Sequence, residues 1–567
     1  MTGYRNDTTA PIRVGGPVVA SPRPRRAQDT SGEPSAFGVQ AARLLSAVDE
    51  DPWGNVRPSL YETARVMSWA PWLHGHGRRT TWVLEQQAAD GSWGEGPAPY
   101  RLLPTLSAVE AVLATLLHTI VPDQEADRLA AAASAGLAAV RDLSPAGPWP
   151  DTAAAEILVP VLVSRINEHL DHAGARSFTS LGPWCRGPRL DVPAGYHISV
   201  PEKVASRCSA AGGIPLKLHH TYEGIARYVP PALSPTPDGL LGSSPAATAA
   251  WAAGEPSSRA VREAAVAELN AVAERYGGLF PEAAPITVFE RLWVAAALAG
   301  PGIPASAWPT IRNWVDRIYD PEGVRGAPGL MPDADDTAMA VLVAALADRP
   351  RDPAPLAVFE NQNRYDCYVG EDTGSVTANA HALQALGGCL RHRPDTEVTY
   401  GPRIRGVRDW LLDQQHRDGR WEDKWHASPY YATERCVTGL AGCDDDRARN
   451  AVRAAAEWAA ETQHGDGSWG VWGGTAEETA YAVNILLCLP APMRQAHHDS
   501  ALADAEAFLR EFESDLPHPA LWHDKTLYAP QAMVEAEVLA AREKLRRQVA
   551  AEQAQDYMYM TMGRADA

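Results

Sequence analysis

The 567-residue chain is poor in cysteine, in positive charge and in long apolar runs. Its seven cysteines are scattered and form no Cys-x-x-Cys pair, which disfavours both a zinc site and a disulfide framework. The first 35 residues contain no apolar signal-peptide core, and no later segment has about 18 apolar residues in a row. From these absences we expect a cytoplasmic enzyme without stable membrane insertion.

The net charge of −19 argues against nucleic-acid binding and against a broad basic membrane surface, because both need clustered Lys and Arg. The negative net charge is still compatible with a local basic site that binds a diphosphate. The 45% of apolar residues can fill a sizeable core, and the length suggests two or more domains.

Strand-like alternation is also missing from most of the chain. Ala- and Leu-rich windows dominate, separated by Gly and Pro clusters, for example at 106–117, 261–276, 337–347 and 451–459. The chain is therefore predicted to be all-α. The polar ends predict a disordered tail over residues 1–35 and a flexible tail over 549–567.

Three segments share a Gln, Asp-Gly and Trp pattern at nearly constant spacing, at 86–94, 414–421 and 463–470. Each follows a helical window and turns at Asp-Gly, where glycine can take a positive φ. Gln can bond and Trp can cover a neighbouring helix end, so we interpret these repeats as links between helix pairs, without a catalytic role.

Three aspartates within four residues, Asp333, Asp335 and Asp336, lead directly into an apolar helical window. Like charges that share a poorly hydrated site raise the pKa of at least one of them, and the retained proton can be delivered to a weak base. The alternative is an acidic helix start that complements the helix dipole.

Motifs elsewhere in the sequence favour the interpretation of the three aspartates as a proton donor. The sequence Asp-Ala-Asp-Asp at 333–336 resembles the Asp-x-Asp-Asp motif with which class II terpene cyclases protonate an alkene. Residues 58–64 resemble the Pro-Ser-x-Tyr-Asp-Thr-Ala of diterpene cyclases, and 421–431 and 521–530 resemble two further signatures of that family. The repeats resemble the family's Gln-Trp motifs. The resemblance covers about residues 50 to 545.

This resemblance implies two α/α-barrel domains, named β and γ, with the active site between them. The β domain is expected at 36–70 and 301–548 and to carry the aspartates, and the inserted γ domain is expected at 71–300. Turn residues at 300–304 suggest the second boundary.

By position in the motif, the resemblance assigns the proton donor to Asp335, with Asp333 and Asp336 holding its hydrogen bonds and raising its pKa. His381 occupies the place of a plant Asn that bonds the acid, and squalene-hopene cyclases use a His for that purpose. A lone His on an apolar helix is otherwise more often a satisfied core residue. Protonating an alkene needs an acid that stays neutral in a water-excluded cavity.

The family binds the diphosphate through Mg²⁺ on an acidic γ-domain motif, which Asp151 and Glu156 resemble. Mg²⁺ prefers such hard oxygen ligands. The alternative is that Asp151 only caps the helix that carries Glu156. Lys203 and Lys424 lie in family-like segments and are predicted to approach the diphosphate.

Aromatic side chains can stabilise a carbocation, and we expect Trp293, Tyr430 and Tyr431 to line the cavity. In plant ent-copalyl diphosphate synthases a His and an Asn hold the water that ends the reaction. Here His220 matches the first position, whereas Glu282 stands where Asn is expected. This departure leaves the product and its stereochemistry open.

The predicted function is cyclisation of geranylgeranyl diphosphate to a bicyclic copalyl-type diphosphate, with the diphosphate retained because class I metal motifs are missing. One alternative uses farnesyl diphosphate and forms a drimenyl-type product. Another is a non-catalytic α/α toroid that binds lipids or proteins. Expected partners are the prenyl diphosphate, a downstream class I terpene synthase and a second copy in a homodimer.

Overall fold

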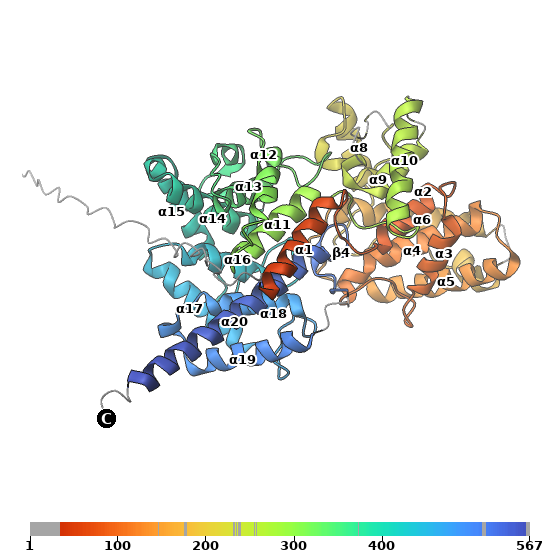
Figure 1. Ribbon diagram of the computed structural model, residues 1–567. Helices are drawn as coiled ribbons and strands as arrows, with labels where there is room; N and C mark the ends of the chain where they lie inside the picture. Colours follow the sequence, from red (N-terminus) through yellow and green to blue (C-terminus); the bar gives the residue numbers. More distant parts are fainter. Residues whose placement is uncertain are drawn as a thin grey trace, which may run out of the picture.

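The computed structural model describes residues 35–562, except 146, 175–177, 231–232, 234, 236–239, 255, 257, 372 and 513–516, and it describes side chains only to residue 550. The predicted disordered tail therefore lies outside the described residues except for Ser35, whose hydroxyl caps the first helix by accepting from the Gly38 N–H. Helices form two groups side by side, as Figure 1 shows.

One group, the β domain, is built around the largest apolar core. Its helices are α1 (Ala36–Glu50), α11 (Thr287–Ala299), α12 (Trp308–Ile318), α13 (Ala334–Leu346), α14 (Val376–His392), α15 (Glu397–Asp413), α16 (Pro429–Ala441), α17 (Asp446–Glu461), α18 (Ala476–Leu487), α19 (Ala496–Glu511) and α20 (Gln531–Met562).

The other group, the γ domain, has three smaller apolar cores. Its helices are α2 (Leu60–Trp69), α3 (His76–Glu85), α4 (Ala98–His118), α5 (Asp123–Leu143), α6 (Ala155–Ala173), α7 (Gly182–Arg186), α8 (Val200–Ala210), α9 (Pro245–Ala253) and α10 (Arg259–Arg275).

Strands are few in the described part of the chain. They form two short antiparallel hairpins, β1 (Glu360–Asn361) with β2 (Arg364–Tyr365), and β3 (Trp522–His523) with β4 (Leu527–Tyr528). The second hairpin lies at the junction of the two helix groups in Figure 1. The all-α prediction is confirmed.

Both predicted domain boundaries need correction. Helix α2, assigned from sequence to β, packs its apolar face into the γ core with α4, and α11, assigned to γ, packs in the β core with α13 and α20. The γ domain therefore starts near residue 60 and ends near 284. The Gly-Pro turn at 300–304 is a connection within β, between α11 and α12.

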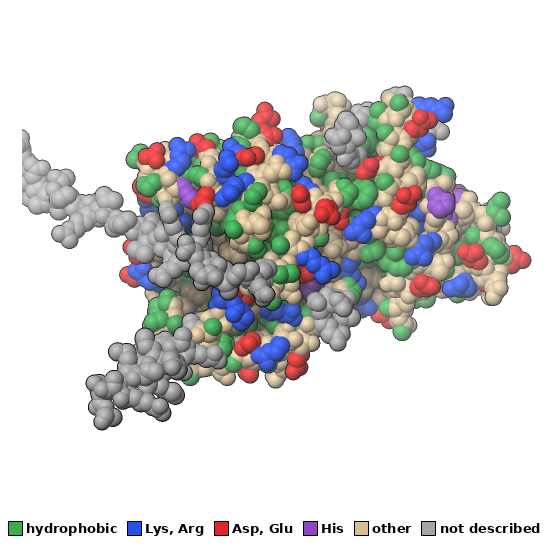
Figure 2. All heavy atoms as spheres, viewed as in Figure 1, with side chains coloured by type: hydrophobic (Ala, Val, Ile, Leu, Met, Phe, Trp, Pro, Cys, Tyr) green, Lys and Arg blue, Asp and Glu red, His purple; other side chains and the backbone are tan. Residues whose placement is uncertain are grey.

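Within the predicted flexible tail at 549–567, α20 continues to Met562, and residues 563–567 lie outside the described residues. Helix α4 is long and apolar enough to cross a membrane, but almost all of it is buried inside the γ core. It is a core helix of that domain. On the face shown in Figure 2, acidic and basic side chains are interspersed.

The Gln-Trp repeats link helices as predicted. Gln415 Nε2 donates to the carbonyls of Gly419 and Ala451, and Trp421 Nε1 donates to the Leu411 carbonyl. The Gly419 φ is +102°, and a Cβ there would lie 2.4 Å from the Ala454 oxygen, so only glycine fits. The repeats at Gln87 and Gln463 make the corresponding bonds.

Candidate active site

The three aspartates occupy the first turn of α13. Asp333 precedes the helix and caps it, its Oδ1 accepting from the Asp336 N–H at 2.7 Å. Burial raises the pKa of Asp333 to about 7, although the Asp336 donors oppose this shift. Burial, followed by repulsion from Asp333, raises the pKa of Asp336 well above its ordinary value. These two carboxyls form a buried pair that takes up protons more easily than exposed carboxyls do.

Asp335 differs from its neighbours in exposure and in partner. Its side chain is 16% exposed, whereas the other two aspartates are buried. Its Oδ1 lies 2.6 Å from Nδ1 of His381, on the adjacent helix α14. The sequence-based expectation that Asp333 and Asp336 hold the hydrogen bonds of Asp335 is not what the geometry shows, because its short side-chain bond goes to His381.

His381 is fully buried and its second ring nitrogen, Nε2, has no hydrogen-bond partner. The Trp293 ring stands perpendicular to the His381 ring at 5.3 Å between centroids. A histidine with one nitrogen against apolar packing and the other on a carboxyl oxygen is fixed in orientation. It can donate to Asp335 as that group loses its proton.

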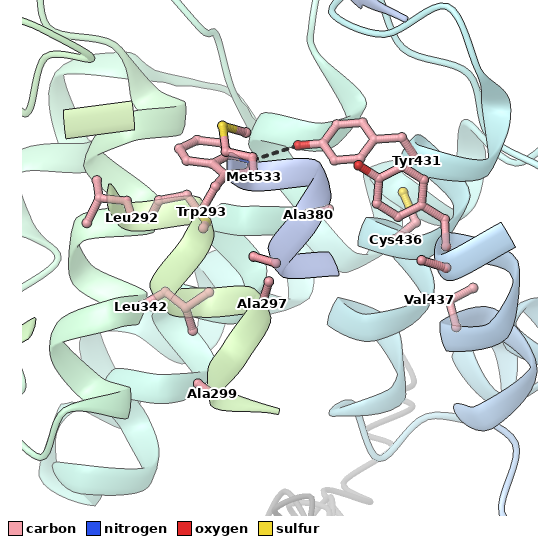
Figure 3. Packing of buried hydrophobic residues seen from close by; sticks show 14 of the residues in the cluster. Leu292, Trp293, Ala297, Ala299, Leu342, Ala380, Tyr431, Cys436, Val437 and Met533 are labelled. Carbon is pink, nitrogen blue, oxygen red and sulfur yellow. Dashed lines mark hydrogen bonds between the residues drawn. The ribbon is translucent and has the colours of Figure 1, made fainter. Parts of the chain in front are cut away.

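An aromatic wall, defined as Phe289, Trp293, Tyr431 and Trp522, extends from this histidine. Trp293 Nε1 donates to the Tyr431 hydroxyl at 2.9 Å, and Met533 of α20 lies beside the indole (Figure 3). Phe289 is 4.4 Å from Trp293, and Trp522 is 4.7 Å from Tyr431, between ring centroids. Such a wall can hold positive charge against its faces.

Tyr430 does not belong to this wall. Its ring packs on Trp458 of α17 at 4.6 Å between centroids, within the β core, while the next residue, Tyr431, points to Trp293. Successive residues on a helix project about 100° apart, which gives the two rings different surroundings here. The structure thus contradicts the predicted substrate contact of Tyr430.

The structure brings His220 and Glu282 into one buried network between the domains. His220 Nδ1 lies 2.7 Å from the Gly242 carbonyl and its Nε2 lies 3.0 Å from Asp524 Oδ1. A carbonyl and a carboxylate both accept, so both ring nitrogens donate. His220 is then an imidazolium with no free lone pair, which argues against its predicted role as terminating base.

Glu282 is completely buried. It accepts from the Thr526 N–H and hydroxyl and from the Ser59 hydroxyl. Burial, with repulsion from Asp524 and Glu62, raises its pKa to about 8. Its lone pairs are directed to protein donors, so the geometry supports a structural part in the network more than proton abstraction from a substrate.

Sequence reasoning missed the centre of that network, Lys525. Its Nζ donates to Glu62 Oε1 at 2.6 Å, to Glu223 Oε1 at 2.9 Å and to Ser244 Oγ at 2.7 Å. The side chain is fully buried, and its pKa is raised because these carboxylates outweigh the loss of hydration. Lysines are seldom fully buried unless they are paired, so the presence of a lysine in the sequence does not by itself indicate a buried network.

Asp151 and Glu156 are both exposed, on the loop before α6 and in its first turn. The loop is held against the β domain, where the Ala153 N–H donates to the Asp524 carbonyl at 2.9 Å. Ala154, and not Asp151, precedes the helix, and no side chain caps it. The alternative that Asp151 is only a cap is therefore wrong.

A crevice beside this loop is lined by both domains, with Tyr100, Thr152 and Tyr196 from γ, and Lys525 and Thr526 from β. Two solvent-facing carboxylates at such a crevice fit Mg²⁺ that shares its other positions with phosphate oxygens and waters. Asp151 and Glu156 offer ligands of the type that Mg²⁺ prefers, and their metal site stays a prediction.

The two predicted lysines lie apart. Lys203 is exposed on α8 of the γ domain. Lys424 Nζ donates to Glu371 Oε2 at 3.0 Å, and the same oxygen accepts from the Cys367 N–H, while the Cys367 carbonyl accepts from the Ala334 N–H. Lys424 is thus linked to the first turn of α13 through Glu371 and Cys367, and its ammonium is paired with a carboxylate of the protein, which argues against its predicted contact with the diphosphate.

Comparison with known proteins found a matching family model and several similar enzymes. Residues 368–485 match the family model of the squalene-hopene cyclase C-terminal domain. A copalyl diphosphate synthase of Streptomyces cyslabdanicus is 61% identical over 92% of this chain and 98% of its own. A labda-7,13-dienyl diphosphate synthase of Streptomyces clavuligerus is 46% identical over 95% of this chain and 97% of its own.

Among solved structures, an ent-copalyl diphosphate synthase from Streptomyces platensis superimposes with a TM-score of 0.83, at 41% identity over 90% of this chain and 99% of that one. Similarity at this level extends over both domains. The chain, with its aspartate cluster at the start of α13 and its two helical domains, belongs to the class II diterpene cyclases of the copalyl diphosphate synthase type.

Proposed function

We propose that the protein cyclises geranylgeranyl diphosphate to a copalyl-type diphosphate and leaves the diphosphate in place. The observation that carries this proposal is the 2.6 Å contact between Asp335, the most accessible of the three aspartates, and the buried His381. In this arrangement His381 is already in position to donate a hydrogen bond to the carboxylate that Asp335 becomes when it gives up its proton.

The reaction begins when the carboxyl proton of Asp335 moves to the terminal alkene, leaving a tertiary carbocation and a carboxylate. A bond from His381 Nδ1–H to Oδ1 stabilises that carboxylate as it forms. Two internal alkenes then attack in sequence, closing two rings, and loss of one proton gives a new alkene. The aromatic wall stabilises the cation meanwhile, and a proton returned to Asp335 completes the cycle.

The position of the final proton loss decides the product. Relatives of this chain are named for copalyl and for labda-7,13-dienyl diphosphates, which share the bicyclic route and differ in the final double bond. Higher identity to the copalyl enzymes supports the copalyl product. Farnesyl diphosphate, with a drimenyl-type product, is the alternative substrate. The pair of Asp335 and His381 disfavours the other alternative, a non-catalytic toroid, because lipid or protein binding does not require an acid with a hydrogen-bond donor in position.

Incubation of the purified protein with the C15, C20 and C30 substrates tests the proposal. We expect a bicyclic C20 alcohol after phosphatase treatment, identified by mass spectrometry against authentic copalol. Product from the C15 substrate alone would assign the drimenyl function. No product from any of the three, with folded protein and Mg²⁺ present, would contradict the proposal.

Mg²⁺ held by Asp151 and Glu156 would supply positive charge to the diphosphate. It would contribute binding that is equal in the ground and transition states, because the diphosphate does not react. Glu156→Ala should then raise KM roughly tenfold with little change in kcat, and EDTA should act in the same direction.

A matched control for that prediction is Glu202→Ala, which removes an exposed glutamate from the first turn of α8, another γ-domain helix. KM should stay at the wild-type value in the control. If neither EDTA nor Glu156→Ala changes KM, the metal assignment is wrong.

We also propose that the enzyme works in the cytoplasm and passes its diphosphate to a class I terpene synthase, which ionises it. All seven cysteines are free, which supports a reducing compartment. A homodimer is our expectation for its assembly, and light scattering would test it.

A further inference from the structure

Glu477, in the first turn of α18, is a fully buried glutamate that the mechanism above does not use. Its Oε1 accepts three bonds, from Trp522 Nε1 at 2.8 Å, the Tyr481 hydroxyl at 3.1 Å and His426 Nε2 at 3.2 Å. Its Oε2 is buried and has no partner. Three donors on one oxygen suit the ionised carboxylate, since a proton on Oε2 would have no acceptor.

No cation neutralises this carboxylate among the described residues. The Ser428 N–H donates to His426 Nδ1 at 3.0 Å, so that nitrogen carries a lone pair and the ring is neutral, with its hydrogen on Nε2. Arg435 lies over the Tyr431 and Tyr481 rings, but its guanidinium is paired with Glu434 and Glu537.

A buried charge without a counter-ion is costly to a fold, and such groups in native structures often have a functional role. Burial and the Glu477 charge both raise the pKa of Tyr481, so its hydroxyl stays protonated and keeps donating. The donors are thereby fixed around a permanent negative charge.

This charge lies directly behind the aromatic wall. Trp522, which donates to Glu477, contacts Tyr431 at 4.7 Å and Phe289 at 5.7 Å between centroids. Tyr431 in turn bonds Trp293, whose ring meets His381 beside the acid. His426 stacks on Tyr431 at 4.9 Å and also lines a cavity of about 520 Å³. The wall thus connects the proton donor at one end with a buried anion at the other.

We infer that Glu477 is a positioning residue whose buried negative charge, acting through Trp522 and Tyr431, stabilises the ring carbocations formed after protonation by Asp335. A hydrogen bond from an indole N–H to a carboxylate increases electron density on the ring, which strengthens its attraction for a cation. The field of the charge adds to this effect, because screening is weak in a water-free interior. The inference rests on the proposed cyclase function and adds a residue to it.

Glu477→Gln is the decisive variant, because glutamine keeps the size and an accepting oxygen and removes only the charge. With the C20 substrate we expect kcat to fall about tenfold to a hundredfold with KM within about twofold, the signature of a group that acts on the transition state. Monocyclic and water-captured diphosphates should appear beside the bicyclic product, because poorly stabilised cations are quenched early.

The matched control is Glu478→Gln. Glu478 is the next residue and is equally buried, but its oxygens accept from the Val471 N–H and the Thr475 hydroxyl, away from the wall. Wild-type product distribution is expected there. Wild-type rate and product in folded Glu477→Gln would overturn the inference while leaving the cyclase function standing, whereas an inactive wild-type protein would instead refute that function.

A second measurement does not depend on turnover. A bicyclic ammonium diphosphate, which carries a fixed positive nitrogen in place of the ring cation, should bind Glu477→Gln about tenfold more weakly than wild type, and its neutral carbon analogue should bind both equally. Equal loss for both analogues would show a packing defect and would contradict the inference. Should glutamine prevent folding, Glu477→Asp, which withdraws the charge by one methylene, is expected to give a partial loss, and unchanged ammonium binding would overturn the role of the charge.

Discussion

Asp335→Asn is expected to abolish cyclisation, with a loss of at least about a thousandfold in kcat, while the protein stays folded and still binds substrate. The asparagine oxygen can accept from His381 as the carboxyl does, so the local packing is preserved. An amide has no comparable proton to donate, and protonation of an alkene has no other source among the residues that face His381. Product formation is measured by mass spectrometry after phosphatase treatment, and folding by circular dichroism.

Two further variants test whether the loss of activity is specific to Asp335. His381→Ala leaves the acid in place and removes its donor, so we expect a large but smaller loss of kcat than for Asp335→Asn. Asp446→Asn, at an exposed position on α17, should behave as wild type. Substantial bicyclic product from folded Asp335→Asn would move the acid to another residue, with Asp333 or Asp336 the first to examine.

Lys525→Met is expected to give the largest loss of stability. Lys525 is the cation for two fully or nearly buried carboxylates, Glu62 and Glu223, which come from different γ-domain segments. Removing one partner of a buried ion pair leaves an uncompensated charge, and typical costs are about 3–5 kcal/mol. We therefore expect an early unfolding transition in urea, in which the γ domain separates from the β3–β4 hairpin.

The pH dependence of this loss follows from the carboxylates. Burial raises the pKa of Glu62 even with Lys525 present, so Glu62 takes up a proton more easily in the folded protein than in the unfolded chain, and acid neutralises the orphaned group. The destabilisation should thus be greatest at alkaline pH and decrease as the pH falls through the raised pKa. A second replacement, Glu62→Gln, should recover part of the loss.

Lys217→Met serves as the control for Lys525→Met, because Lys217 is an exposed lysine on the γ domain, the domain that Lys525 contacts. Its urea transition should match that of the wild type. If Lys525→Met also unfolds as wild type, the buried lysine is not what joins the domains.

A structural feature of this protein could be predicted from the sequence when it depends on residues that are neighbours in the chain. The Ala- and Leu-rich windows were sufficient to predict an all-α chain, because helix periodicity is written in neighbouring residues. The Asp-Gly turns likewise predicted the links between helices, which Gln415 and Trp421 form. Domain boundaries were less accurate, since the apolar faces of α2 and α11 do not say which core receives them.

The sequence by itself determined the acidic cluster, and its resemblance to the Asp-x-Asp-Asp motif of class II terpene cyclases indicated the chemistry. Only the tertiary structure showed that Asp335 is the most accessible of the three aspartates. It also showed that α14 brings His381 to Asp335 from 46 residues away. Likewise, the fold alone separated Tyr431 from Tyr430, and it paired Lys525 with Glu62 over 463 residues. Pairings across such distances depend on helix packing, which local patterns do not encode.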